Sequence, residues 1–201
     1  CDRRQRQMCI RDRKAVRESA EKRHTDVARR KEILLGTNQY PNVNEMAAEK
    51  IVDLKGSLGC SCGKHNGDAC DNAAGLPTKR AASDFEDLRL ATEAASKRPK
   101  VFMLTIGNLA MRLARAQFST NFFGCAGYEI IDNRGFNTVE EGVDAALAKG
   151  ADIVVLCSSD DEYAEYAPAA FKYLNGRAEF VVAGAPACME DLKAQGLSLI
   201  H

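Results

Sequence analysis

From residue 100 onward, the chain alternates between short apolar runs and longer segments whose apolar residues recur every three or four positions. Short apolar runs bounded by glycine or polar turns are typical of buried strands, and the longer periodic segments are typical of amphipathic helices. The pattern predicts strands at residues 101–106, 128–132, 151–157 and 179–184. It predicts helices at residues 109–122, 139–149, 162–174 and 187–195.

Three of these strands, 101–106, 151–157 and 179–184, are apolar at nearly every position. Parallel strands covered by helices on both faces have this composition, whereas strands covered on one face alternate with polar residues. Four consecutive strand–helix units therefore predict an α/β domain with an open, flavodoxin-like, doubly wound parallel sheet. A fifth strand is expected after Gly196, where we expect the native sequence to end, and the residues that follow, LSLIH, are apolar enough to take the place of that strand.

The residues before position 99 show no pattern that could close a hydrophobic core alone. A charged helix with a thin apolar stripe is expected over 14–31, followed by a short strand at 33–35 and a weak helix over 46–59. Residues 60–78 are small and polar, which predicts a linker. A further helix is expected over 80–98. Ser83 would be its N-cap, and Glu86, three residues later, would complete a capping box.

Both ends of the chain have unusual sequences. Residues 8–13, MCIRDR, can be encoded by ATG TGT ATA AGA GAC AG, the end of a transposase adapter used to prepare sequencing libraries. Its reverse complement, CTG TCT CTT ATA CAC, encodes LSLIH, which is residues 197–201. We therefore expect 1–13 and 197–201 to be translated adapter sequence on a metagenomic fragment.

Charge and hydropathy exclude two classes of partner. The chain has 28 basic and 28 acidic residues, and the part between the two unusual ends is slightly acidic. It therefore lacks the basic surface of a nucleic-acid-binding protein. No apolar run is long enough to cross a bilayer, and no hydrophobic signal segment follows the basic start. We expect a cytoplasmic protein without a membrane contact.

Four stretches of the last domain match a known family: RPKVFMLTIGNLAMRLARAQFSTNFF, GYEIIDNRGFNTVEEGVDAAL, ADIVVLCSSDDEYAEYAP and FVVAGAPACMEDLKAQG. They resemble the C-terminal cobalamin-binding domain of the methylmalonyl-CoA mutase family, most closely the small-subunit branch of the heterodimeric bacterial enzymes. Two earlier stretches, ARRKEILLGTNQYPN and DFEDLRLATE, resemble the late barrel segment and the linker helix of that family.

This resemblance implies a division of the chain into domains. Residues 14–58 would be a remnant of the end of a (β/α)8 barrel, 59–98 a linker with one helix, and 99–196 the cobalamin-binding-like domain. The parent enzyme would be an isomerase of propionate metabolism that converts methylmalonyl-CoA to succinyl-CoA with adenosylcobalamin. Its large, catalytic subunit would be the partner of this chain.

The turn after the first strand departs from the family pattern. Cobalamin-binding members carry Asp-x-His-x-x-Gly there; the histidine ligates the cobalt and the aspartate orients the histidine. This chain has GNLAMR at 107–112, and its histidines are His24, His65 and His201. The resemblance therefore implies a degenerate domain that is structural and binds its partner. We expect no catalytic residue and no bound cofactor in this chain.

Five residues mark the edge where a remnant of the cofactor site would lie. Gly107 and Asn108 follow the first strand, Ser158 and Ser159 the third, and Gly184 the fourth. The carboxyl ends of parallel strands meet at one edge of a sheet, where ligands bind in this fold. The rival hypothesis is a functional module that grips cobalamin base-on at this edge, without a protein histidine.

A structural interpretation of the same edge needs no ligand. Asp160 or Asp161 could cap the helix that begins near Glu162, where a carboxylate is favoured. Gly184 and Pro186 would then serve a tight turn between a strand and a helix.

The linker contains a second candidate site, formed by Cys60, Cys62, His65 and Cys70. Thiolates and imidazole at short spacing suit a tetrahedral zinc ion, which makes a zinc-stabilised interaction module a further rival. The spacing lacks the usual Cys-x2-Cys pair. A loop that happens to contain cysteines is the simpler interpretation, so no metal is expected.

Overall fold

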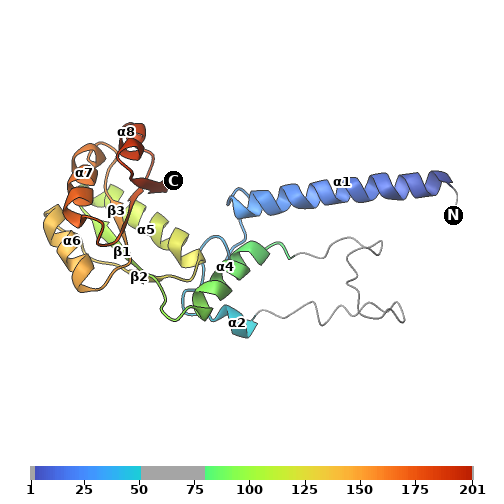
Figure 1. Ribbon diagram of the computed structural model, residues 1–201, viewed down its shortest axis with the longest axis horizontal. Helices are drawn as coiled ribbons and strands as arrows, with labels where there is room; N and C mark the ends of the chain where they lie inside the picture. The colour runs from blue at the N-terminus through green and yellow to red at the C-terminus, as the bar shows by residue number, and fades with distance from the viewer. Residues whose placement is uncertain (1–2, 51–79, 201) are drawn as a thin grey trace.

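A five-stranded parallel sheet forms the centre of the α/β domain in the computed structural model, which describes residues 3–50 and 80–200 (Figure 1). The strands are β1 (Lys100–Thr105), β2 (Glu129–Ile131), β3 (Ile153–Cys157), β4 (Glu179–Ala183) and β5 (Ser198–Ile200). They lie in the order β2-β1-β3-β4-β5, and every neighbouring pair is parallel. The predicted flavodoxin-like, doubly wound α/β fold is confirmed.

Each of the first four strands leads into a helix. These helices are α5 (Leu109–Cys125), α6 (Val139–Ala148), α7 (Tyr163–Leu174) and α8 (Met189–Ala194). All four predicted strands and all four predicted helices of this domain are present, with ends that differ by a few residues. The expected fifth strand is β5, which lies in the segment assigned to adapter sequence; the origin of that segment stays a prediction.

The sheet separates two hydrophobic cores because successive side chains of a strand point to opposite faces. Phe102, Leu104 and Ile106 pack with apolar residues of α6 and α7 on one face. Val101 and Met103 pack with residues of α5 on the other face. Strands β1 and β3 are buried along nearly their whole length, and β4 is buried except at its exposed first residue, Glu179, and the half-buried Val181.

Three described helices precede the sheet: α1 (Arg3–Ala28), α2 (Ala47–Lys50) and α4 (Ser83–Ala94). Helix α1 is longer than predicted, begins within the segment assigned to adapter sequence, and extends away from the α/β domain (Figure 1). The assignment of residues 14–58 to a barrel remnant and of 59–98 to a linker stays a prediction, and residues 51–79 lie outside the described chain.

The strand predicted at 33–35 is wrong. In the described chain, Leu35 forms an isolated bridge with Gln39 instead. The reason is the fully buried side chain of Asn38, which accepts from the N–H of Leu34 at 2.8 Å and donates to the carbonyl of Glu32 at 2.9 Å. A side chain thus provides the hydrogen bonds that a neighbouring strand would otherwise provide.

The cap predicted at Ser83 is also wrong. Ser83 is the first residue of α4, and its hydroxyl donates to the carbonyl of Arg80 at 2.9 Å. The hydroxyl therefore turns back toward the preceding residues and leaves the first N–H groups of the helix to other partners. Glu86 forms an ion pair with Arg80 at 2.7 Å.

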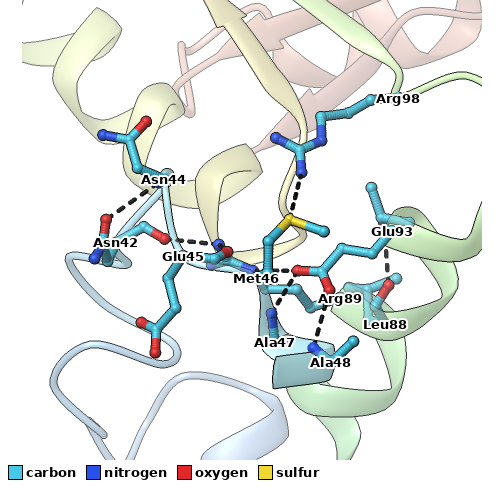
Figure 2. Close-up of polar contacts among 11 residues, drawn as sticks. Asn42, Asn44, Glu45, Met46, Ala47, Ala48, Leu88, Arg89, Glu93 and Arg98 are labelled. Carbon is cyan, nitrogen blue, oxygen red and sulfur yellow. Dashed lines mark hydrogen bonds and ion pairs between the residues drawn. The ribbon is translucent and has the colours of Figure 1, made fainter. Parts of the chain in front are cut away.

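Helix α4 is joined to the segment 42–48 by hydrogen bonds from the two side chains of a buried ion pair within α4 (Figure 2). Glu93 pairs with Arg89 at 3.4 Å, and the two side chains are 4% and 11% exposed, respectively. The Glu93 carboxylate accepts from the N–H groups of Ala47 and Ala48, at 2.8 and 3.1 Å. Arg89 donates to two backbone carbonyls of the same segment. Polar contacts thus hold residues 42–48 against α4, since this segment has too few apolar residues to form a core.

Candidate functional site

The carboxyl edge of the sheet brings together the five residues that the sequence singled out. Gly107 and Asn108 form the turn between β1 and α5, Ser158 and Ser159 follow β3, and Gly184 follows β4. The chain runs from β1 outward to β2 and then back to β3 on the other side of β1. The turns after β1 and β3 therefore flank the switch point of the sheet, which is the usual ligand crevice of this fold.

Glu162, which the sequence did not single out, lies at the centre of this edge. Its Oε2 accepts from the Ser158 and Ser159 hydroxyls, at 2.5 and 2.7 Å. The same oxygen accepts from the N–H of Ser159 at 3.2 Å and from the N–H of Asn108 at 3.2 Å. These donors, the Ser158 hydroxyl first and the Ser159 hydroxyl next, lower the pKa of Glu162 to about 2, although partial burial opposes its ionisation. The carboxylate is therefore a satisfied anion held by both turns.

The Glu162 carboxylate also fills the space directly over Gly107. A Cβ added to Gly107 would lie 2.1 Å from Oε2, well inside contact distance. Gly107 has a φ of +78°, a backbone conformation that favours glycine for a second reason. The glycine therefore allows close approach, but the group that approaches is a side chain of the same protein.

Two arginines of α5 cover the neighbouring glycines of the same edge. A Cβ on Gly135, in the loop after β2, would lie 2.7 Å from Cζ of Arg112. A Cβ on Gly184 would lie 3.2 Å from both Arg115 Cζ and Asp160 Oδ1. Arg115 Nη2 and Asp160 Oδ1 form an ion pair at 2.9 Å. Charged side chains of the chain thus occupy the space beside all three glycines.

Tyr163 lies in the core beneath this edge and contacts the ends of two strands. Its ring is fully buried in the core, and its hydroxyl accepts from the N–H of Ser158 at 3.0 Å and donates to the carbonyl of Ala183. Burial raises the pKa of Tyr163, so the hydroxyl stays protonated and able to donate. The ends of β3 and β4 are therefore linked by one side chain.

Two of the predicted residues have structural contacts at the helix ends. The side chain of Asn108 accepts from the N–H groups of Ala110 and Met111, at 3.1 and 3.2 Å, and thereby caps α5. The cap predicted for α7 at Asp160 or Asp161 is wrong: in the described chain no side-chain hydrogen bond caps α7, and Asp160 pairs with Arg115 instead.

One signal in the sequence could have identified Glu162. Ser159 and Glu162 have the Ser-x-x-Glu spacing of a capping box, in which the glutamate reaches back to the N–H of the serine. That half of the box is present, since Ser159 N donates to Glu162. The contact with Asn108, 54 positions away, has no local signal.

The residues of this edge do not fit cobalt ligation through a protein histidine. The turn that would carry the ligand is GNLAMR, which contains no imidazole, and a carboxylate lies over its glycine. Within residues 3–50 and 80–200, no group of three or more His, Cys, Asp or Glu residues could hold a metal ion. The predicted zinc residues Cys60, Cys62, His65 and Cys70 lie outside the described residues.

Over the part of the chain that the structure describes, no helix has both the length and the apolar character needed to cross a membrane.

The sheet order and the glycine turns at its switch point define residues 100–200 as a flavodoxin-like α/β domain. Over 184 residues, 92% of its length, the chain is 67% identical to the methylmalonyl-CoA mutase small subunit of Porphyromonas gingivalis. It is 31% identical over 172 residues to the methylmalonyl-CoA mutase small subunit of Streptomyces virginiae. It is 29% identical over 152 residues to a probable methylmalonyl-CoA mutase small subunit of Mycobacterium bovis.

These relatives confirm the resemblance seen in the sequence: the chain is homologous to a part of methylmalonyl-CoA mutase small subunits. The chain spans 29% of the Porphyromonas protein and 26% of the Streptomyces protein. No protein-family model matches it.

Proposed function

We propose that the chain is part of a methylmalonyl-CoA mutase small subunit whose α/β domain is structural and binds its partner without carrying cobalamin. The parent enzyme would convert methylmalonyl-CoA to succinyl-CoA, and its large subunit would hold the adenosylcobalamin and catalyse the reaction. The observation that carries this proposal is the turn after β1, where GNLAMR provides no histidine for cobalt.

The edge of the sheet supports the same proposal. A corrin nucleotide held at the switch point would need close approach to Gly107 and Gly184, the glycines of the turns after β1 and β4. Both positions are covered by charged side chains, Glu162 over the first and the Arg115–Asp160 pair beside the second. Base-on binding of cobalamin without a protein histidine would need the same space, so the covered edge argues against that rival as well.

The outer surface of α5 supports a role in partner binding. Leu109 and Leu113 are one helical turn apart and are 60% and 54% exposed. Neighbouring exposed apolar side chains are typical of surfaces that contact another protein. We place the contact with the large subunit on this face of α5.

Activity and complex formation together test the proposal. We expect the purified chain to show no isomerisation of methylmalonyl-CoA when adenosylcobalamin is added. We expect it to co-elute with a methylmalonyl-CoA mutase large subunit in size-exclusion chromatography. The Leu109→Asp/Leu113→Asp variant should weaken co-elution, and Leu88→Asp, at an exposed position of α4, should leave it unchanged. Isomerase activity of the chain alone, or failure to bind the large subunit, would contradict the proposal.

A further inference from the structure

The two turns that flank the switch point are joined by one carboxylate. Asn108 belongs to the turn after β1, and Ser158 and Ser159 belong to the turn after β3. All three donate to Oε2 of Glu162. A helix cap would explain the bond from Ser159, which lies three residues before Glu162. It would not explain the bond from Asn108, which joins the turn after β1 to Glu162 at the start of α7.

We propose that Glu162 is an internal latch that closes the switch-point crevice: its carboxylate occupies the space over Gly107 and holds the turns after β1 and β3 together. A ligand could enter this crevice only after the carboxylate leaves. The inference rests on the proposed function, because a domain that carried cobalamin at this edge would need the crevice open.

The surroundings of Glu162 stabilise the closed arrangement. Arg112 donates to the carbonyl of Gly107 at 3.3 Å, on the same turn that the carboxylate contacts. The Arg115–Asp160 pair links α5 to the turn after β3 at a second point, beside Gly184. The carboxylate is only partly exposed to solvent, so hydrogen bonds to it are worth more than they would be at an open surface.

Amide exchange in the full chain tests the latch without any cofactor. In Glu162→Ala, we expect the Asn108 and Ser159 N–H groups to exchange about tenfold faster than in wild type, because they lose a charged acceptor. Glu162→Gln keeps the side-chain volume but loses the charge. In this variant the Asn108 and Ser159 N–H groups should exchange at a rate between those of wild type and Glu162→Ala. The control is Glu165→Gln, at an exposed position in the first turn of α7, which should match wild type.

Two further measurements separate a latch from a merely structural residue. Sodium acetate, compared with sodium chloride at equal ionic strength, should slow the exchange of Asn108 in Glu162→Ala, because acetate can replace the missing carboxylate. Gly107→Ala should expel the Glu162 carboxylate, since the added methyl would lie 2.1 Å from Oε2. Asn108 should therefore exchange faster in Gly107→Ala than in wild type, even though Glu162 is present in that variant.

Wild-type exchange of Asn108 in both Glu162→Ala and Glu162→Gln would overturn the latch, and so would wild-type exchange of Asn108 in Gly107→Ala. Neither result would bear on the proposed function. Conversely, retention of cobalamin by the wild-type chain would refute the proposed function. The exchange data would still show whether Glu162 holds the two turns together.

Discussion

Tyr163→Phe is expected to lower the free energy of unfolding by about 1–3 kcal/mol, and Tyr163→Ala by about 3–5 kcal/mol or more. The phenylalanine variant keeps the ring but removes the hydroxyl. The N–H of Ser158 then loses its acceptor and the carbonyl of Ala183 loses its donor, both in a buried setting. The alanine variant adds a cavity in the core shared by β1, β3, α6 and α7.

Chemical denaturation of the full chain, followed by circular dichroism, measures both effects. Tyr173→Phe is the matched control, because its hydroxyl contacts the carboxylate of Asp144 at 3.1 and 3.2 Å on the surface. A surface hydrogen bond should contribute less than about 0.5 kcal/mol. If Tyr163→Phe is as stable as the Tyr173 control, the hydroxyl does not hold the ends of β3 and β4 together.

Glu93→Ala should cost about 3–5 kcal/mol in the contact between α4 and residues 42–48, because it leaves the buried Arg89 cation without its carboxylate partner. The change also removes the acceptor of the Ala47 and Ala48 N–H groups (Figure 2). Burial opposes the ionisation of Glu93, but these two N–H groups and Arg89 outweigh it and lower its pKa. The carboxylate is therefore ionised when it forms these bonds.

The loss should appear first as undocking of residues 42–48 rather than as unfolding of the sheet. Amide exchange at Ala47 and Ala48 should accelerate strongly in Glu93→Ala, while exchange in β1 and β3 stays close to that of wild type. Asp87→Ala, at an exposed position of the same helix, provides the control. Unchanged exchange at Ala47 in the Glu93 variant would show that the segment is held by other contacts.

The α/β domain could be predicted from sequence because the apolar pattern that indicates each strand or helix lies within that element. Each central strand is a continuous apolar run, such as VFMLT in β1, and each is followed by a helix of regular period. The order of the strands follows from the doubly wound class once the units are known. The ends of the elements differ from those predicted because frayed ends and short edge strands carry little pattern.

Polar contacts between distant residues could not be predicted in this way. Glu93 contacts Ala47 across 46 positions, and Glu162 contacts Asn108 across 54. Asn38 replaces a strand partner with its own side chain, which no period in the sequence reveals. Each depends on three-dimensional proximity rather than on spacing.

The candidate site likewise combines features that a local pattern predicts with contacts between distant residues that it does not predict. The sequence predicted that the five residues would share one edge of the sheet, and they do, because each follows the carboxyl end of a parallel strand. It also identified the absent histidine, because a missing residue type is directly visible in GNLAMR. It did not identify the closure of the edge by Glu162 and by the Arg115–Asp160 pair, since these groups come from different turns and helices.

The central claim is that this domain carries no cobalamin, and a visible-absorbance titration of the full chain with adenosylcobalamin tests it most directly. We predict no change in the spectrum of the cofactor and no corrin retained on the protein after gel filtration. Retained corrin with an unchanged base-on spectrum would contradict the account, because it would make the domain a cobalamin carrier that needs no protein histidine.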